Sequence, residues 1–511
     1  MAITRSAATE RPTASRIARP APHWRTAELV WLVAGIVLIA CGLGLVYRAK
    51  TYDFADIEKG LSTRHLLNLN QLSAREDLLP VLNTVLPDAN PRADAARRIY
   101  YLSGRLSNVG AIARQHDLLT PAEFRAFKPL VVVRAPAQFR RAFFLWTAMF
   151  FAAFLLAHAW LSLRGFRGDQ SILPVTLLLT GIGLILMISL RDPVRDHLLF
   201  ADFAQGAAAG AILLAGASTL DYERLFGKLS FVPLIASIVL SAVLIFFGSG
   251  PGSSDAKVNL FGFQPVELIR LLLVFFLAGY FAQHWDVLRH AHERRPRLAA
   301  LTRHFDIPPV EYILPVFVSV LLALAFFFLQ RDMGPALVFA CVFLVLYGVA
   351  RGSAFLPLAG FAGLAMGFAV GYAIGFPHTV RERVSMWLSP WNNLVHGGDQ
   401  LAHSLWAFAT GGATGTGIGL GQPQIVPAAH TDLVLSALGE EFGFVGIAAV
   451  FALYAFFVYR AMRIALRAHR DYEFFLAVGL AAATSIQLLL IAGGALGVFP
   501  LSGVVTPFLS Y

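Results

Sequence analysis

The chain has 511 residues, of which 57% are hydrophobic, only 14% are charged and 42 are phenylalanine. This composition excludes an ordinary soluble globular protein and is typical of a polytopic membrane protein. The net charge of +10 is divided among short loops, so we interpret it as a topology signal rather than as a nucleic-acid surface. Cys41 and Cys341 both lie in apolar runs, so the sequence indicates neither a disulfide framework nor a thiolate metal site.

Long apolar runs recur along the chain. A membrane-spanning helix needs about 20 apolar residues, and about eleven runs approach that length. All of them are expected to be helices, because lipid offers no partner for an unpaired backbone group and the runs are too uniformly apolar for barrel strands. The predicted fold class is therefore all-α and polytopic. The predicted spans are residues 29–47, 142–162, 171–190, 204–219, 231–248, 266–283, 312–329, 335–350, 354–376, 432–459 and 473–492.

The placement of arginine predicts the orientation in the membrane. Residues 1–28 form a basic tail with almost no acid, which is expected to stay in the cytoplasm. Counting spans from there places the basic segments 289–303 and 460–470 on the same side. The long loop 377–430 then lies on the extracytoplasmic face.

Residues 48–141 interrupt the membrane pattern, because they mix acids and bases with helix-like apolar spacing and several prolines. We predict a small, mainly helical extracytoplasmic domain. With its flanking spans it forms a module over residues 29–165, and the multi-span core follows over residues 171–511. A solvated spacer and a partner-docking domain both remain possible interpretations.

Several ionisable residues lie where a membrane disfavours charge. Glu267 and Arg270 are three residues apart at the start of an apolar helix, so they share a face and can pair. Such residues are functional candidates, although a purely structural ion pair also explains them. Asp332, in "QRDMG", lies between two spans, where it either serves a site or complements the dipole of the next helix.

The long outer loop concentrates polar residues in "RERVSMWLSPWNNLVHGGDQ", which begins with Arg381 and Arg383. A glycine-rich stretch, "ATGGATGTGIGLGQPQ", follows it. A nucleotide fingerprint is a poor interpretation, because no strand precedes the glycines. Glycines also permit close approach to a phosphate or a tight re-entrant path. The glycines concerned are Gly411, Gly412, Gly415, Gly417, Gly419 and Gly421.

A last group, His430, Asp432, Glu440 and Glu441, flanks the outer half of one span in "HTDLVLSALGEEFGFVG". These residues are conceivable metal ligands, but their spacing matches no recognised zinc motif. Taken together, the outer face combines arginines, acids and a glycine loop beside lipid. This suits a substrate with an anionic head and an apolar tail, in which arginines hold a diphosphate and an acid acts as general base.

From about Ile172 to Tyr511 the motifs resemble, in order, those of the SEDS family (shape, elongation, division and sporulation), which includes RodA and FtsW. "QPVE" is similar to the family's QPSE, with Arg270 at its lysine position. "QRDMG" is similar to QPDLG, and Lys257 falls near an extracytoplasmic basic residue of the family. The remaining similar segments are "RERVSMWLSPW", "DQLAHSLWAFATGGATGTGIGLG", "IVPAAHTDLVLSALGEEFGFVG" and "GVFPLSGVVTPFLSY".

The resemblance implies a peptidoglycan glycosyltransferase that polymerises lipid II at the outer face of the bacterial cytoplasmic membrane, for cell-wall growth, shape or division. Its implied partners are a class B penicillin-binding transpeptidase and other divisome or elongasome membrane proteins. A divalent cation, Mg²⁺ or Mn²⁺, stays open as a cofactor, and no nucleotide is implied. Arg381, Arg383, Lys257 and Gln400 are expected to bind substrate, with Glu267 and Arg270 shaping the cavity. Asp332, His430, Asp432 and Glu440 are expected to be structural or gating.

The loop departs from the family at the position of the presumed catalytic aspartate, where this chain has Asn393 in "PWNNLVHGGDQ". A neutral amide cannot act as a base. Asp399, six residues on, is the only carboxylate of the loop between Glu382 and Asp432. Our preferred hypothesis is that Asp399 has taken over the role, and the rival hypothesis is loss of polymerase activity.

Two further departures concern the ends of the core. The family continues past Tyr511 through a Gly-Gly-Ser motif and a last helix, so we expect either a truncated sequence or a helix supplied from elsewhere. The N-terminal pair of spans lies outside the family core. Two other functions stay open, a flippase for a lipid-linked precursor and a non-catalytic scaffold that activates a transpeptidase.

Overall fold

The computed structural model describes residues 24–115, 118–227, 229–250, 256–260, 264–289, 310–392 and 398–511. Within these residues the chain is almost entirely helical, and its one sheet pairs β1 (Leu67–Asn68) in parallel with β2 (Val131–Val132).

Every predicted span coincides with a helix, so the all-α polytopic prediction is confirmed. Ten of these helices are long and apolar enough to cross a membrane, and α10 has 17 residues and falls short of that length. The eleven helices are α1 (Thr26–Lys50), α7 (Pro136–Leu163), α8 (Ile172–Ser189), α9 (Leu199–Ala217), α10 (Phe231–Phe247), α11 (Val266–Arg289), α13 (Val310–Leu329), α14 (Met333–Arg351), α15 (Phe355–Ile374), α18 (Val434–Ala465) and α19 (Asp471–Ala495).

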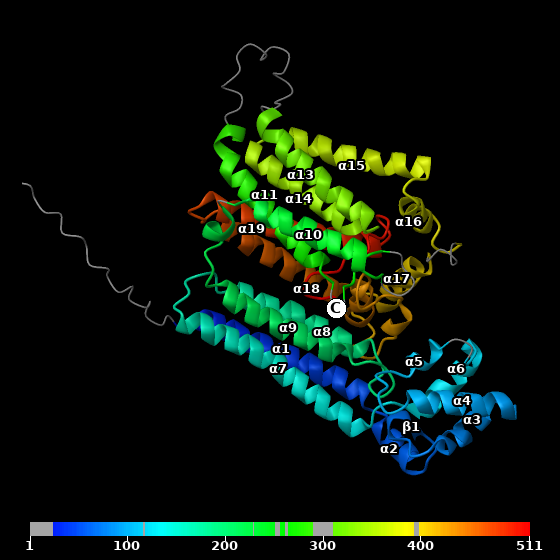
Figure 1. Cartoon of the computed structure of the whole chain (residues 1–511). Helices are drawn as coiled ribbons and strands as arrows, with labels where there is room; N and C mark the ends of the chain where they lie inside the picture. Colours follow the sequence, from blue (N-terminus) through cyan, green and yellow to red (C-terminus); the bar gives the residue numbers. More distant parts are fainter. Residues whose placement is uncertain are drawn as a thin grey trace, which may run out of the picture.

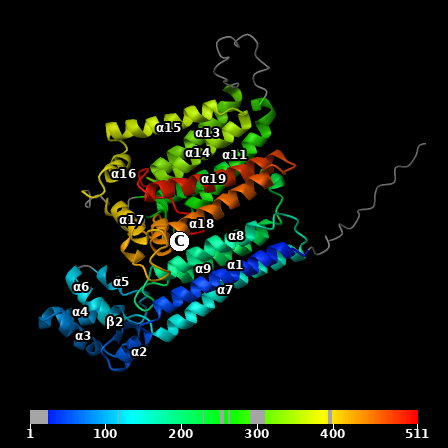
Figure 2. The same cartoon turned by 180° about the vertical axis from the view of Figure 1, so that it is seen from behind.

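The spans form two groups that both views display (Figures 1 and 2). In one group α1 packs along α8 and α7 packs along α9, and the other group contains α10, α11, α13, α14, α18 and α19. Glycines bring α1 and α8 close together. A Cβ at Gly42 would lie 2.6 Å from Ile185, and a Cβ at Gly181 would lie 2.6 Å from Ile39. Close helix contact through small residues is the usual packing mode in a membrane.

Residues between α1 and α7 form a small helical unit at one end of the bundle. Its own core includes Leu82, Ile99 and Phe127. The unit is fixed to the turn between α8 and α9, because the N–H of Val133 donates to the carbonyl oxygen of Val194 at 3.0 Å. Its helices are α2 (Phe54–Ser62), α3 (Leu79–Val85), α4 (Ala89–Leu102), α5 (Gly110–Ala113) and α6 (Pro121–Phe127), with 3-10 turns at Leu69–Gln71, Arg75–Leu78 and Lys128–Leu130.

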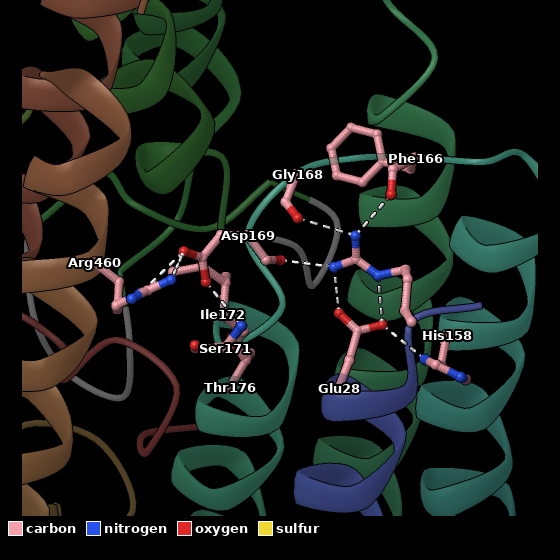
Figure 3. A network of polar contacts seen from close by, with 10 residues as sticks. Glu28, His158, Phe166, Gly168, Asp169, Ser171, Ile172, Thr176 and Arg460 are labelled. Carbon is pink, nitrogen blue, oxygen red and sulfur yellow. Dashed lines mark hydrogen bonds and ion pairs between the residues drawn. The ribbon is translucent and has the colours of Figure 1, made fainter. Parts of the chain in front are cut away.

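A buried ionic network ties the first helices to the core at the opposite end of the bundle (Figure 3). Arg25 and Glu28 are 1% and 0% exposed, and Arg25 Nε donates to Glu28 at 3.0 Å. His158 of α7 lies 2.7 Å from the same carboxylate. Arg25 also donates to the carbonyl oxygen of Asp169 at 2.6 Å, and the Asp169 side chain accepts from Arg460 of α18. Each buried charge therefore has a partner, as burial in low dielectric requires.

The predicted long outer loop contains two helices of its own, α16 (His378–Leu388) and α17 (Gly398–Gly411). They lie at the same end of the bundle as the unit α2–α6 (Figure 1). The segment after α19 returns into the bundle, where Val504 and Leu509 are buried. Residues Glu223–Gly227 form a short π turn, and Pro423–Ile425 form a 3-10 turn.

Candidate active site

Arg383 joins three separate parts of the core. It lies on α16 and donates from Nη1 to the carbonyl oxygens of Leu501, at 3.0 Å, and Ser502, at 2.5 Å. The Ser502 carbonyl also lies 2.5 Å from where a Cβ at Gly334 would be, so the returning segment rests on the first turn of α14. The absence of a side chain at Gly334 permits this approach.

Asp332 lies beside this junction, in the turn that precedes α14. Burial raises the pKa of Asp332 from 3.8 to about 6, although Arg383 and Arg270 both act to lower the pKa. A carboxyl group with such a pKa changes charge close to neutral pH. That property suits a general base or acid.

Asp432 lies in the turn before α18, within range of the charge of Arg383. Burial raises the pKa of Asp432, while a hydrogen bond from Thr431 and the charge of Arg383 oppose that rise. The charge of Arg383 therefore acts on two carboxyl groups, Asp332 and Asp432, which lie at the N-termini of α14 and α18. Helix N-termini attract negative charge, so this junction suits an anionic ligand as well as its own acids.

The Glu267–Arg270 pair forms as predicted, through their shared face of α11. Arg270 is only 7% exposed. With the amide of Gln487 turned so that its oxygen faces Arg270, the oxygen accepts from Nη2 at 2.8 Å. A cavity of about 150 Å³ opens here between α11, α14 and α19, with these three side chains and Thr484 as its polar lining. Sequence analysis missed Gln487, although a glutamine within an apolar span is itself a signal.

The other predicted substrate-binding residues lie around this junction with exposed or half-buried side chains. Lys257 is exposed, and its N–H donates to the carbonyl oxygen of Gln330 at 2.9 Å, which places it beside the turn that carries Asp332. Arg381 is an exposed residue of α16 and approaches Gly375. Gln400 is half-buried in the first turn of α17.

Asp399 also lies in the first turn of α17 and is half-buried. Its carbonyl oxygen lies 2.7 Å from Nδ1 of His403. Within the part of the chain that the structure describes, no hydrogen bond or ion pair joins the Asp399 carboxylate to Arg383. Asn393 lies outside the described residues.

The glycine-rich segment lies against a break in α18. Gly443 has φ 65° and ψ −167°, which interrupts the helix and frees its backbone groups. The N–H of Thr416 donates to the carbonyl oxygen of Glu440 at 2.9 Å, and a Cβ at Gly415, where φ is +83°, would overlap the carbonyl oxygen of Glu441. The glycines thus serve a tight backbone path. The segment follows helix α17, whereas a dinucleotide fingerprint follows a strand.

His430 lies in the connection that leads to α18, and Glu440 lies within α18, three residues before its break at Gly443. The Glu440 carboxylate accepts from the N–H of Gln422 at 2.7 Å. Burial and the neighbouring Arg191 both lower the pKa of His430, which favours the neutral imidazole. His430 and Arg191 line a cavity of about 200 Å³. Sequence analysis did not single out Arg191, because only the fold brings the turn after α8 to this loop.

The described residues contain no group of three or more His, Cys, Asp or Glu side chains that could hold a metal ion by themselves. Mg²⁺ is often held by one or two carboxylates together with substrate phosphates. Asp332 and Asp432 fit that smaller requirement, since they lie in the turns before α14 and α18 and the charge of Asp432 acts on Asp332.

Comparison with known proteins places most of this architecture in one family. The model of the FtsW/RodA/SpoVE family, described as cell cycle protein, matches residues 169–511. The peptidoglycan glycosyltransferase RodA of Mycobacterium leprae is 31% identical over 373 residues, which cover 70% of this chain and 77% of that protein. A probable peptidoglycan glycosyltransferase FtsW of a Geobacter species is 29% identical over an alignment that covers 67% of this chain and 91% of the FtsW chain. A solved RodA structure from Thermus thermophilus has 22% identity and a TM-score of 0.45, over a superposition that covers 68% of this chain and 91% of the RodA chain.

Proposed function

This chain belongs to the FtsW/RodA/SpoVE family of cell cycle proteins, and on that basis we propose that it is a peptidoglycan glycosyltransferase that polymerises lipid II. The names of the RodA and FtsW relatives support this activity. The observation that carries the proposal is the outer junction, in which Arg383 binds the returning segment and its charge acts on the carboxyl groups of Asp332 and Asp432.

The reaction joins a sugar hydroxyl of the acceptor to the anomeric carbon of the donor. The bond from that carbon to the diphosphate breaks, undecaprenyl diphosphate leaves, and a base takes the hydroxyl proton. Arginines suit the leaving diphosphate, because a guanidinium can hold phosphate oxygens at two points. Arg383 commits Nη1 to two carbonyl oxygens, which fixes its plane and leaves other N–H groups for substrate. Arg381 and Lys257 add exposed cations nearby.

Two carboxyl groups compete for the role of base. Asp399 lies in the loop that carries the family's aspartate, and its carboxylate is half-buried in the first turn of α17. The charges of Arg383 and Arg270 act on Asp332, and its pKa of about 6 leaves most of it ionised at neutral pH. Removal of the true base abolishes glycan synthesis, whereas removal of the other acid weakens binding or folding. We propose Asp399 as the base and Asp332 as its rival.

A bound divalent cation would be held by Asp332 and Asp432 together with substrate phosphates, where it would neutralise charge on the leaving group. The arginines at the same junction provide positive charge from the protein itself. A metal titration of glycan synthesis with Mg²⁺ and Mn²⁺ tests this assignment.

The protein is a multi-pass membrane protein. We propose the bacterial cytoplasmic membrane as its location, with the N-terminus in the cytoplasm. Basic segments are expected at the end of the bundle at which α1 begins, and basic loops usually stay on the cytoplasmic side. A class B penicillin-binding transpeptidase and other divisome or elongasome membrane proteins are the proposed partners. Co-purification with the transpeptidase tests that part of the proposal.

The substitution at Asn393 favours a second candidate, a scaffold that binds and activates a transpeptidase without making glycan. A precursor flippase is a third. Lipid II supplied to the purified full chain separates them. Glycan strands support the glycosyltransferase, transport across liposomes without glycan supports the flippase, and transpeptidase activation with neither supports the scaffold.

A further inference from the structure

Two tryptophan rings lie together on the long outer loop. Trp391 follows α16 and Trp406 lies on α17, and the centroids of their rings are 5.4 Å apart. The two residues are 51% and 54% exposed. Exposed rings of a membrane protein face either lipid or water, and the residues that share the surface of α17 with Trp406 decide between these two surroundings.

The face of α17 that carries Trp406 is polar. Four residues follow one another at helical spacing and form one line along this face: Asp399, His403, Trp406 and Thr410. All four are exposed or half-buried, and each of their side chains carries a polar atom. A helix face that contacts lipid is apolar, because a bilayer interior offers no partner for polar groups. The line, and with it the pair of tryptophans, therefore faces water.

The opposite face of α17 is fixed to the core. The hydroxyl of Ser404, which is 0% exposed, donates to the carbonyl oxygen of Ala495 at 2.7 Å and lies 2.6 Å from the hydroxyl of Ser436. The end of α16 is fixed in the same region, because Nε1 of Trp387 donates to the carbonyl oxygen of Gly497 at 2.7 Å. Both segments that carry the exposed tryptophans are thus attached to the end of α19. A pair held in this way needs little further ordering to bind a ligand.

The chemistry of this surface suits a sugar ring. One face of a β-linked hexose ring carries mainly C–H groups, whose slight positive charge is attracted to the negative face of an aromatic ring. The hydroxyl groups at its edge need hydrogen-bond partners. The ring of His403 meets that of Trp406 edge-on, with 5.1 Å between centroids, and its Nδ1 lies 2.7 Å from the carbonyl oxygen of Asp399. Because a carbonyl oxygen only accepts, Nδ1 carries the hydrogen, and Nε2 of the neutral imidazole is then an acceptor for a sugar hydroxyl.

The same line of α17 leads from the tryptophans to the proposed base. Trp406 follows Asp399 by seven residues, which corresponds to about 10 Å along a helix and to about the length of two linked hexose rings. A sugar stacked on the tryptophans would therefore place the next ring of its chain beside Asp399. Since both rings are about half exposed, the surface is open, which suits a chain that extends away from the site.

We propose that Trp391 and Trp406 form a binding platform for the growing glycan strand, a β-linked chain of amino sugars, and hold that strand next to Asp399. The identity of the strand rests on the proposed glycosyltransferase function, whereas sugar binding is measured without any activity.

The test measures binding of chitotetraose, an uncharged β-linked tetramer of N-acetylglucosamine, to the full chain by saturation-transfer NMR. The protein is held in phospholipid nanodiscs, because the sugar headgroup of a glycoside detergent would compete with the probe. In Trp406→Ala and Trp391→Ala we expect Kd to rise at least about fivefold, since each variant removes one aromatic surface. Glycan strands made from lipid II by these variants should be shorter than those of the wild type. The matched control is Trp31→Ala, which should bind as wild type, since Trp31 is 64% exposed in the second turn of α1.

Two further variants separate ring stacking from general apolar contact, and each variant is checked for folding by its thermal midpoint. Trp406→Phe keeps a flat ring and should retain most of the affinity, whereas Trp406→Leu keeps apolar surface without a ring and should bind as weakly as Trp406→Ala. The proposal is overturned if the folded wild type does not bind chitotetraose, or if Trp406→Ala or Trp406→Leu binds it with the wild-type Kd. If the wild type binds the probe through these tryptophans but makes no glycan from lipid II, the proposed function fails and the sugar platform stands.

Discussion

The guanidinium of Arg383 donates to the carbonyl oxygen of Ser502 at 2.5 Å, across 119 residues of sequence. This hydrogen bond holds α16 to the segment that returns after α19. The charge of the same guanidinium acts on the acids Asp332 and Asp432. One arginine thus links several segments at the outer end of the core. One of its guanidinium nitrogens, Nη1, donates to backbone carbonyl oxygens.

Arg383→Lys tests whether that geometry matters beyond charge. A lysine ammonium is a point charge that cannot reproduce the planar set of donors, so we expect kcat/KM for lipid II to fall at least about tenfold. Arg467→Lys is the control, since Arg467 is exposed and lies after α18. Equal activity of Arg383→Lys and wild type would show that only the positive charge is needed.

The pH dependence of glycan synthesis reports on Asp332. With a pKa of about 6, the ionised fraction of Asp332 rises about tenfold between pH 5 and pH 7. If glycan synthesis needs the ionised form, its rate rises by the same factor. Because the folded-state pKa is raised above 3.8, the folded protein binds more protons in the window between about 3.8 and 6. The contribution of Asp332 to stability is therefore lost as the pH rises through that window.

Asp332→Asn should remove the acidic limb of that profile while weaker glycan synthesis persists, and Asp94→Asn, in an exposed ion pair, should change neither. An unchanged limb in Asp332→Asn would assign the titration to another group. Rates at fixed, saturating lipid II over the pH range provide the measurement.

Gly415→Ala should destabilise the protein by about 2 kcal/mol or more, because it combines a φ of +83° with overlap on the Glu441 carbonyl oxygen. Gly206→Ala in α9 is the matched control, since nothing lies within 4 Å of its added methyl group. Thermal unfolding in detergent measures both. If the thermal unfolding midpoint of Gly415→Ala equals that of Gly206→Ala, the described path of the glycine-rich segment is contradicted.

Glu28→Gln removes the charge at the centre of the network in Figure 3. Arg25 and Glu28 are fully buried, so we expect a loss of about 3 kcal/mol, as when one partner of a buried pair is removed. Asp94→Asn removes an acid of an exposed pair with Arg97 and should cost less than about 1 kcal/mol. Thermal unfolding in detergent measures both variants. Equal unfolding midpoints for Glu28→Gln and Asp94→Asn would mean that the network does not stabilise the packing of α1.

Hydropathy predicts the spans because a bilayer forces each apolar run into a helix of fixed minimum length. The Glu267–Arg270 pair follows from spacing within a single helix. Local patterns contain no information on Arg25 with Asp169 or on Arg383 with Ser502. Each of those pairs joins segments whose relative placement only tertiary packing determines. The roles of Asp399 and Asn393 remain predictions.

Lipid II polymerisation by the purified full chain, alone and with its transpeptidase, tests the central claim most directly. The comparison is between wild type, Asp399→Ala and Asn393→Asp, each checked for folding by its thermal midpoint. We predict glycan strands from the wild type and none from Asp399→Ala, because the only acid between Glu382 and Asp432 then disappears. No glycan from the folded wild type, with glycan gained in Asn393→Asp, would contradict the account and identify a core that keeps the family architecture without its chemistry.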